Sequence, residues 1–187
     1  MAAKSTLKNM ALCLTLVCLF SSGILAAVYA VTYQPILQAS QKALQESIGK
    51  VLPEGGTVSE ARTASFGGQE YEYYVSESEG EPLAYAVTSS VNGFSGTLKL
   101  MVGVLPDGTV CNTAVLECNE TPGLGAKCQT DEAFISQFRG FSGRLDVKKD
   151  GGDIDGITAS TITSRAYTKA VRNAVELVKS FNSSEEE

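Results

Sequence analysis

The most constraining feature of this 187-residue sequence is a stretch without one charged residue, which extends from residue 9 to residue 41. Within it, residues 10–31 are almost all apolar. As an α-helix at about 1.5 Å per residue they reach ~33 Å, about the thickness of the hydrocarbon core of a bilayer. The sequence therefore predicts a transmembrane helix over residues 10–32, preceded by a short N-terminal segment of residues 1–9.

The basic residues near this helix predict its orientation. Lys4 and Lys8 precede the apolar stretch, and no basic residue follows it before Lys42. The positive-inside rule therefore predicts that the short N-terminal segment is cytoplasmic and that the rest of the chain lies across the membrane. A cleaved signal peptide is the alternative, because Val28 and Ala30 are small residues of the kind that precede a cleavage site.

The apolar stretch is followed by a second helical pattern and then by a domain-sized segment. Pro35 is expected to break the membrane helix or to kink its exit. Apolar residues then recur at helical spacing, which predicts an amphipathic connecting helix over residues 33–55. Residues 56–182 suit one compact domain. Residues 183–187 are an acidic tail that we expect to be disordered.

The domain segment has short strand-like runs between helical ends, which predicts an α+β fold of antiparallel strands and hairpins flanked by helices. A Pro-Asp-Gly turn at residues 106–108 predicts a hairpin. Thr130 is expected to cap a short helix through Phe138, and a longer helix is expected over residues 163–181. The predicted strands are Tyr71–Val75, Leu83–Ser90, Thr97–Leu105, Thr109–Leu116 and Arg144–Lys148.

Composition excludes several classes of function. The chain has no histidine, which rules out Ser-His-Asp and Cys-His nucleophilic sites and histidine-ligated zinc or haem. It has 15 Lys and Arg against 21 Asp and Glu, for a net charge of −6, and no basic run, which argues against a nucleic-acid partner. With 43% hydrophobic and 19% charged residues, it can bury a core.

A run of small and hydroxyl residues, Asp155 to Ser164, stands directly before the closing helix. Backbone N–H groups at a helix N-terminus, together with hydroxyls, form a natural seat for a phosphate group, and Arg165 follows to neutralise its charge. The alternative is an ordinary Ser/Thr-rich helix cap.

A second candidate is the loop Glu120-Thr121-Pro122-Gly123-Leu124-Gly125. Its glycines and proline favour a tight turn whose backbone can approach a planar ligand closely. Taken alone this signal is weak, because Pro-Gly loops are common.

Together these segments resemble a known family, the FMN-binding G subunit of the Rnf electron-transport complex, with the C subunit of the sodium-pumping NADH:quinone reductase as a close relative. The resemblance covers nearly the whole chain and includes Gly93-Phe94-Ser95-Gly96 and Leu100-Met101-Val102-Gly103. The family motif consists of Asp, two residues, Ser or Thr, Gly or Ala, a small residue and a modified Thr. The match implies that Thr161 is bound to FMN through a phosphoester.

The resemblance also implies further site residues and a maturation partner. The FMN would come from FAD through a separate flavin transferase. Where the commonest form of the motif has Gly-Ala this chain has Ala159-Ser160, and if the glycine needs a positive φ, Ala159 is modestly strained. A positive charge such as Lys127 beside the ring would stabilise an anionic flavin. The implied motif residues are Asp155, Thr158, Ala159 and Ser160; those near the phosphate or ribityl chain are Thr158, Thr163 and Ser164; those beside the ring are Glu120, Thr121, Gly123, Leu124 and Gly125.

The function that the resemblance implies is electron relay in a bacterial or archaeal cytoplasmic-membrane complex. The complex would move electrons between reduced ferredoxin and NAD, coupled to Na+ or H+ transport, with membrane and iron–sulfur or flavin subunits as partners. The alternatives are the equivalent quinone-reductase subunit and a non-redox, membrane-anchored binding or assembly subunit. No substrate chemistry of its own is expected.

The remaining features leave alternatives open. Cys111, Cys118 and Cys128 match no structural zinc or iron–sulfur spacing. Two of them could form a disulfide in an oxidising compartment, with Cys111 and Cys118 as neighbours if both lie on one strand or its end, but free thiols are the preferred interpretation. The run Tyr71-Glu72-Tyr73-Tyr74 could be a stacking site, although a half-buried edge strand is preferred.

Overall fold

A computed structural model describes residues 7–185, and the chain divides into two compact units, Met1–Ala43 and Leu44–Glu187. Helix α1 (Leu7–Val51) forms the first unit and continues into the second. In the first unit its large apolar side chains are exposed, and the helix is long and apolar enough to cross a membrane. Pro35 lies inside α1 without interrupting it, so the connecting helix predicted over residues 33–55 is a continuation of the same helix.

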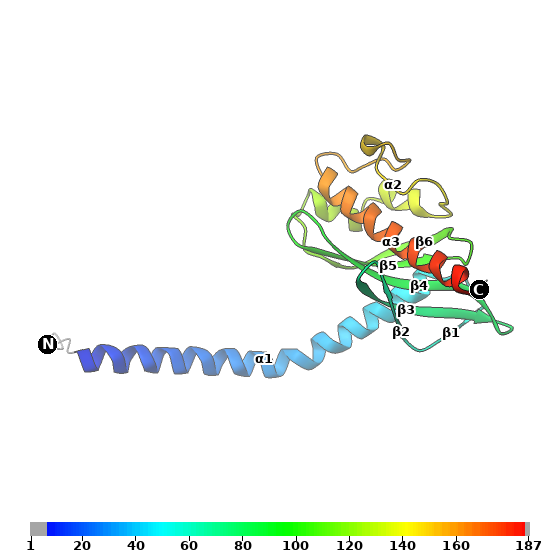
Figure 1. The fold of residues 1–187 in the computed structure, drawn as a ribbon. Helices are drawn as coiled ribbons and strands as arrows, with labels where there is room; N and C mark the ends of the chain where they lie inside the picture. The colour runs from blue at the N-terminus through cyan, green and yellow to red at the C-terminus, as the bar shows by residue number, and fades with distance from the viewer. Residues whose placement is uncertain (1–6, 186–187) are drawn as a thin grey trace. The chain divides into compact units, whose positions relative to one another are not determined.

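The second unit is built on an antiparallel sheet in the order β1-β3-β4-β5-β6, with β2 also paired to β3 (Figure 1). The four long strands confirm the sequence prediction. Both faces of the central strands are covered over much of their length, so their side chains are buried with little alternation. The strands are β1 (Thr57–Val58), β2 (Arg62–Phe66), β3 (Gln69–Ser78), β4 (Glu81–Asn92), β5 (Thr97–Val104) and β6 (Val110–Cys118).

Helix α3 (Thr161–Glu185) lies across one face of the sheet and buries the main core (Figure 1). Its apolar stripe, which includes Tyr167, Val171 and Val178, packs against side chains such as Val87 and Leu100. The helix begins two residues before its predicted start and extends four residues beyond its predicted end. The predicted tail is therefore helical as far as Glu185, and residues 186 and 187 lie outside the described residues.

The last turns of α1 cover part of the opposite face of the sheet. Ile48 and Val51 pack with Tyr74, Ala86 and Met101 in a second, smaller cluster. The compact unit therefore begins within α1, about a dozen residues before the predicted boundary at residue 56.

Two tight hairpins join the first long strands. Between β2 and β3, Gly67 and Gly68 both have positive φ, and between β3 and β4 the same holds for Glu79 and Gly80. Two central residues with positive φ are typical of the two-residue hairpin turns whose twist matches the strands. The predicted Pro-Asp-Gly turn between β5 and β6 is also confirmed, with Gly108 at a φ of 89°.

Three local predictions were wrong. Strand β3 is not an edge strand, because it pairs with β1 and β2 on one side and β4 on the other; Tyr71 and Tyr74 are buried as a result. Residues 144–148 form no strand. The chain there turns back on itself, so that the N–H of Lys148 donates to the carbonyl of Ile154.

The third correction concerns the short helix before the closing segment. The carboxylate of Asp131, rather than Thr130, caps α2 (Glu132–Ile135) by accepting a hydrogen bond from the N–H of Ala133 at 3.1 Å. The short 3₁₀ helices are η1 (Gly125–Gln129), η2 (Ser136–Phe138) and η3 (Lys148–Asp150).

Candidate functional site

The candidate site lies at the N-terminus of α3, where the predicted motif ends. Thr161 is the first residue of the helix and is partly exposed. The ammonium of Lys149, in η3, donates a hydrogen bond to Thr161 Oγ1 at 3.2 Å. An α-helix leaves its first backbone N–H groups without intrahelical acceptors, so this end combines unpaired donors with a cation. The arrangement suits an anion attached to the hydroxyl of Thr161.

The six residues before the helix, Asp155 to Ser160, form what we call the attachment loop. Ser164, one turn into α3, is completely buried and holds this loop in place. Its hydroxyl accepts from the N–H of Ile157 at 2.9 Å and donates to the carbonyl of Ser160 at 2.9 Å. The loop is thus fastened to the helix that it precedes.

Ala159 adopts a left-handed backbone conformation, with a φ of 61°. Together with Glu79 it is one of two non-glycine residues with positive φ among residues 7–185. This conformation costs roughly 1–2 kcal/mol for an L-residue with a Cβ atom. The modest strain expected if this position requires a positive φ is therefore present.

A second segment, Asn119 to Gly125, faces the attachment loop; we call it the glycine loop. The carboxylate of Glu120 is buried, and it accepts hydrogen bonds from the N–H groups of Phe94, at 2.6 Å, and of Ser95, at 3.4 Å. The hydroxyl groups of Thr121 and Ser95 lie 2.9 Å apart. Glu120 thus ties the glycine loop to the turn between β4 and β5.

The glycine loop also lies in close contact with the start of α3. A Cβ atom on Gly125 would lie 2.6 Å from Thr163 Oγ1 and 2.7 Å from Glu120 Oε2. Both separations are too short for a carbon atom. Only glycine fits at this position, because the backbone itself is packed against the helix.

A cavity of about 380 Å³ lies between these two loops. Phe94, Leu124 and Ile162 give it an apolar rim, because their side chains are 69%, 45% and 48% exposed. Its lining is completed by Glu120, Thr121, Gly125, Ala159, Ser160, Thr161 and Thr163. The cavity therefore joins an apolar surface to a hydroxyl group at a helix N-terminus.

A second, smaller hollow of about 260 Å³ adjoins the first, and Ala159 and Thr161 line both. Asp155 and Thr158 line it with Lys148 and Lys149. Lys148 is paired with Asp155 at 2.6 Å. Thr161 lines both hollows, so its hydroxyl lies between the apolar cavity and the basic residues of η3.

Arg165 does not occupy the position that the sequence analysis gave it. Its guanidinium donates two hydrogen bonds to Asp150, at 2.6 and 2.7 Å. These hydrogen bonds lower the pKa of the Asp150 carboxyl and raise the pKa of Arg165. Lys149 is thus the cation at the Thr161 hydroxyl, whereas Arg165 fastens η3 to the helix.

Comparison with known proteins identifies the family. Residues 93–176, which include both loops, match the model of the FMN-binding domain. The G subunit of the proton-translocating ferredoxin:NAD(+) oxidoreductase complex of Clostridium ljungdahlii is 36% identical over 90% of this chain and 89% of its own length. The G subunit of the ion-translocating oxidoreductase complex of Shewanella baltica is 36% identical over 87% and 84%, and that of Vibrio cholerae 35% over 84% and 83%.

This chain belongs to the G-subunit family of ion-translocating oxidoreductase complexes. The family resemblance stated from the sequence is therefore confirmed. Among solved structures, the C subunit of the Na(+)-translocating NADH-quinone reductase of Parabacteroides distasonis is 28% identical, with a TM-score of 0.46 over 57% of this chain and 59% of its own. NqrC of Shewanella oneidensis is 20% identical, also with a TM-score of 0.46, over 59% and 62%.

The structure brings most of the predicted site residues of this G subunit together around the two adjacent hollows. Eight of them line the cavity between the loops, and Asp155 and Thr158 line the adjacent hollow. Gly123 and Ser164 line neither, because Gly123 lies at the exposed turn of the glycine loop and Ser164 is buried beneath the attachment loop. Lys127 also lines neither hollow.

Sequence reasoning missed three residues of the site, namely Phe94, Lys149 and Ile162. Phe94 entered only as part of the family resemblance, and Ile162 lies beside Thr161 in the motif itself. An exposed phenylalanine in a glycine-rich turn was an available signal. The contact of Lys149 with Thr161 arises only from the fold of η3 and could not be found from spacing.

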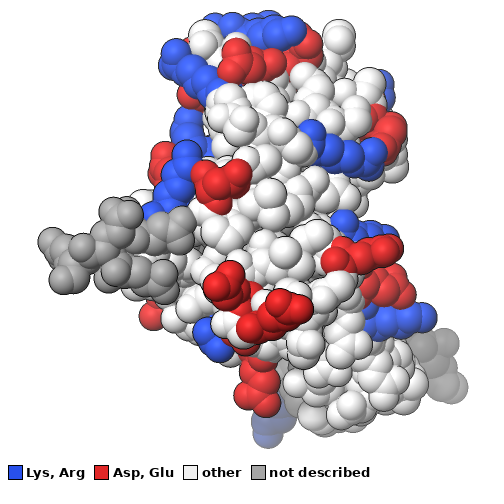
Figure 2. Space-filling model, turned by 90° about the vertical axis from the view of Figure 1, so that its right-hand side faces the viewer, with Lys and Arg blue, Asp and Glu red and all other residues white. Residues whose placement is uncertain are grey.

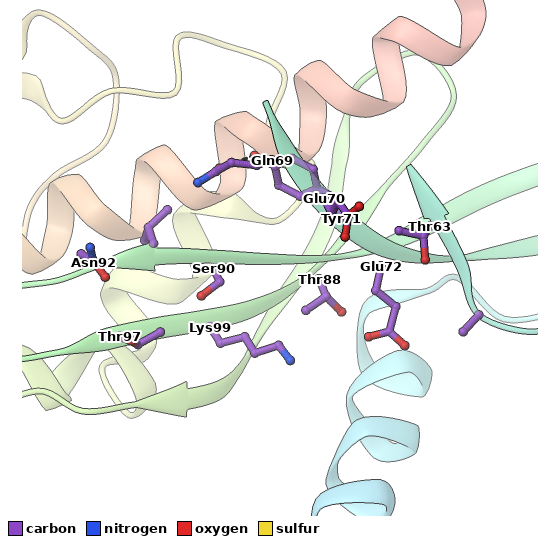
Figure 3. A pocket seen from close by; sticks show the side chains of 12 residues that line it. Thr63, Gln69, Glu70, Tyr71, Glu72, Thr88, Ser90, Asn92, Thr97 and Lys99 are labelled. Atoms are coloured by element: carbon purple, nitrogen blue, oxygen red, sulfur yellow. Dashed lines mark hydrogen bonds between the residues drawn. The ribbon is translucent and has the colours of Figure 1, made fainter. Parts of the chain in front are cut away.

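A larger hollow, of about 760 Å³, lies elsewhere on the domain (Figure 3). It covers the polar part of the sheet face, where Glu72, Thr88, Ser90 and Lys99 project from β3, β4 and β5. It includes no helix N-terminus and no glycine in close packing. Acidic and basic side chains are also interspersed on the face of the protein shown in Figure 2. Size alone therefore does not single out a functional site here.

Proposed function

We propose that this protein carries FMN covalently on Thr161 and relays electrons through it within a membrane-bound complex. By likeness to the relative named as part of a proton-translocating ferredoxin:NAD(+) oxidoreductase, the complex would couple electron flow between reduced ferredoxin and NAD to transport of Na+ or H+. The curated relatives favour this role over that of the quinone-reductase subunit, because those from Clostridium, Shewanella and Vibrio are all named as G subunits.

One observation supports the attachment at Thr161 above all. Thr161 lines the cavity at the first residue of α3, and its hydroxyl accepts a hydrogen bond from Lys149 at 3.2 Å. The negative charge of a phosphodiester there would be balanced by the ammonium of Lys149, and its oxygens would accept hydrogen bonds from the backbone N–H groups at the start of the helix. Thr161 Oγ1 would take the FMN phosphoryl group from FAD with AMP as the leaving group, a step that we assign to a separate flavin transferase.

The residues present fit the cofactor. The buried hydroxyl of Ser160, beside Thr161, has no hydrogen-bond partner among the described residues, so a donor or acceptor on a bound ligand would satisfy it. The cavity of about 380 Å³ lies within the usual range for small-molecule sites. The apolar rim of Phe94, Leu124 and Ile162 suits one face of a planar ring.

The division of tasks follows from this geometry. When bound, FMN supplies the capacity to accept and release electrons one or two at a time. The chain's own residues position it: Lys149 and the start of α3 hold the phosphate, and Glu120 fixes the backbone against which the ring would lie. Covalent attachment prevents loss of the cofactor from an extracytoplasmic domain, where flavin is not made.

We assign α1 as the membrane anchor, with the N-terminus in the cytoplasm and the FMN-binding domain on the outer side. The basis is the charge-free stretch and the lysines that precede it. Other subunits of the complex would bring electrons to this domain and take them away.

The test is co-expression of the full chain with an active flavin transferase, for wild type, Thr161→Ala and Thr130→Ala, an exposed threonine outside both loops. We expect the intact mass of wild type and of Thr130→Ala to rise by one FMN less one water, with in-gel flavin fluorescence after denaturation. Thr161→Ala should lose both signals, whereas Lys149→Met should lower the extent of modification. An unmodified wild-type chain, beside a known substrate that the transferase does modify, would refute the covalent relay.

The same variants separate the non-redox alternatives. If Thr161→Ala assembled into the complex and left electron transport unchanged, an anion-binding or assembly role would replace the relay.

A further inference from the structure

Two of the cysteines, Cys118 and Cys128, lie close together at the two ends of the segment that contains the glycine loop. Cys118 ends β6, Cys128 lies in η1, and their sulfur atoms are 3.8 Å apart. Both are free thiols in this structure. The glycine loop lies between them in the sequence. The chain leaves the sheet at Cys118, passes through the glycine loop, and returns in η1, where Cys128 lies beside Cys118.

Cys111 is excluded from this pairing. It lies near the opposite end of β6 from Cys118, seven positions away, which in a strand corresponds to roughly 20 Å. The pairing of Cys111 with Cys118, left open by the sequence, is therefore ruled out by their positions on one extended strand.

We propose that Cys118 and Cys128 are a redox-active pair whose disulfide closes the base of the glycine loop. The proposal rests on the approach of the two sulfur atoms, on their position at the two ends of one site wall and on their unequal exposure. It concerns the thiols themselves and does not require that flavin be bound; only its consequence for the site rests on the proposed function.

The two thiols differ in a way that suits exchange with an external disulfide. Cys118 is partly exposed, whereas Cys128 is completely buried. Burial, followed by the neighbouring Cys118, raises the pKa of the Cys128 thiol to about 12. Cys118 is therefore the sulfur that an oxidant can reach, whereas Cys128 stays protonated and does not attack an external disulfide itself. Cys128 completes the bond because its sulfur lies 3.8 Å from that of Cys118, next to any mixed disulfide formed there.

The oxidant is a disulfide, either a small-molecule disulfide or a thiol–disulfide exchange protein. The Cys118 thiolate attacks it, one thiol leaves, and a mixed disulfide with Cys118 forms. The sulfur of Cys128, losing its proton, then displaces the second thiol and the Cys118–Cys128 bond forms. Two electrons and two protons pass to the oxidant, which leaves as two thiols.

The bond would restrain the wall that contains Glu120 and Gly125. A loop whose ends are joined samples fewer conformations, so the loop should open less often. We expect proteolytic cleavage within residues 119–127 to slow at least tenfold on oxidation.

The experiment uses the full chain in detergent with Cys13 and Cys18 both replaced by Ser, so that α1 contributes no thiol. The protein is equilibrated in glutathione buffers of increasing oxidised fraction, quenched with acid, denatured and alkylated with N-ethylmaleimide. We expect two of the three remaining thiols to become resistant to alkylation, with a mass two hydrogens lower and a linked peptide that joins Cys118 to Cys128.

Matched variants make the test specific. Cys111→Ser should keep the linked peptide, whereas Cys118→Ser should abolish it and leave Cys128 as a buried single thiol. The proposal would be overturned if all three thiols remained alkylatable in fully oxidised glutathione, or if the recovered link contained Cys111 or joined two chains.

Repeating the measurement with Thr161→Ala separates this proposal from the proposed function. A Cys118–Cys128 link in a chain without flavin supports the pair even if the covalent relay fails. Flavin on Thr161 without the link in wild type refutes the pair and leaves the relay intact.

Discussion

The two walls of the cavity are held by opposite means. The attachment loop is fastened by polar side chains from outside it: the hydroxyl of Ser164 holds its end, Gln137 and Lys148 hold Asp155 at its start, and the loop includes a strained alanine. The glycine loop is held by a buried carboxylate and by backbone packing so close that Gly125 has no room for a side chain. A covalent bond would fix the ligand's position at the first wall, whereas the second must fit it by shape. We therefore expect the glycine loop to be the less tolerant of change.

The largest effect should come from Glu120→Ala. It removes two hydrogen bonds from the N–H groups of Phe94 and Ser95 to a charged carboxylate, and a hydrogen bond of this kind contributes about 1.5–3 kcal/mol at good geometry, which only the shorter of the two has. We expect the free energy of unfolding to fall by about 2–4 kcal/mol, measured by urea denaturation of the full chain in detergent. Glu81→Ala is the matched control, because Glu81 is an exposed residue away from the glycine loop and should change stability by less than about 0.5 kcal/mol. Equal effects of the two variants would contradict the anchoring role of Glu120.

The attachment loop should be less sensitive to loss of its own anchor. Ser164→Ala removes the acceptor of the Ile157 N–H and should cost about 1–2 kcal/mol in the same measurement. Thr158→Ala, at an exposed position of this loop, is the control and should be close to neutral. If Ser164→Ala cost more than Glu120→Ala, the order of the two walls would be reversed.

The parts of the molecule that could be predicted from sequence are those with local signals. The apolar stretch, the periodic closing helix and the Pro-Asp-Gly turn each depend on neighbouring residues, and the structure confirms all three. Strand β2 was missed because it is short and mostly exposed, with only Ala64 and Phe66 partly buried against the core. The edge position assigned to the run Tyr71-Glu72-Tyr73-Tyr74 was wrong because β2, one of the strands that pairs with it, had not been predicted.

The site was only half accessible to sequence reasoning. The residues of the Asp155–Ser164 run left a phosphate site and an ordinary helix cap both open, and the choice of Thr161 came from the family motif. The contact of Lys149 with Thr161 and the approach of Cys118 to Cys128 join segments that are separate in sequence. Such contacts depend on how short 3₁₀ helices fold back, for which the sequence has no periodic pattern.

The buried thiol of Cys128 should make the free energy of unfolding depend on pH in alkaline solution. Burial raises the pKa of Cys128 to about 12 from an ordinary value near 9, so the folded state retains a proton that the unfolded state loses. Its contribution to stability is complete below about pH 9 and falls as pH rises towards 12. Between pH 9 and 10 this loss amounts to about 1 kcal/mol.

The measurement compares urea denaturation at pH 7, 9 and 10 for the reduced chain and for Cys128→Ser. The variant should show a smaller loss between pH 9 and 10. Cys111→Ser controls for the second thiol of the domain whose pKa burial raises. Identical pH profiles for wild type and Cys128→Ser would show that the buried thiol does not titrate as described.

The smallest effect, opposite in sign, should come from Ala159→Gly in the attachment loop. Glycine relieves a left-handed strain of roughly 1–2 kcal/mol but makes the unfolded chain more flexible, at a cost of about 0.4–1 kcal/mol. We therefore expect a net stabilisation of about 0.5 kcal/mol.

Ala133→Gly, at an exposed position of α2, is the matched control and should destabilise by about 0.5–1 kcal/mol, because Ala133 has ordinary helical geometry. Opposite shifts of the two urea midpoints would show that Ala159 is strained in the attachment loop. The glycine loop has no such strained residue, because the residue with positive φ there is Gly123. Equal losses in both variants would mean that Ala159 is not strained and that the two walls differ only in their anchors.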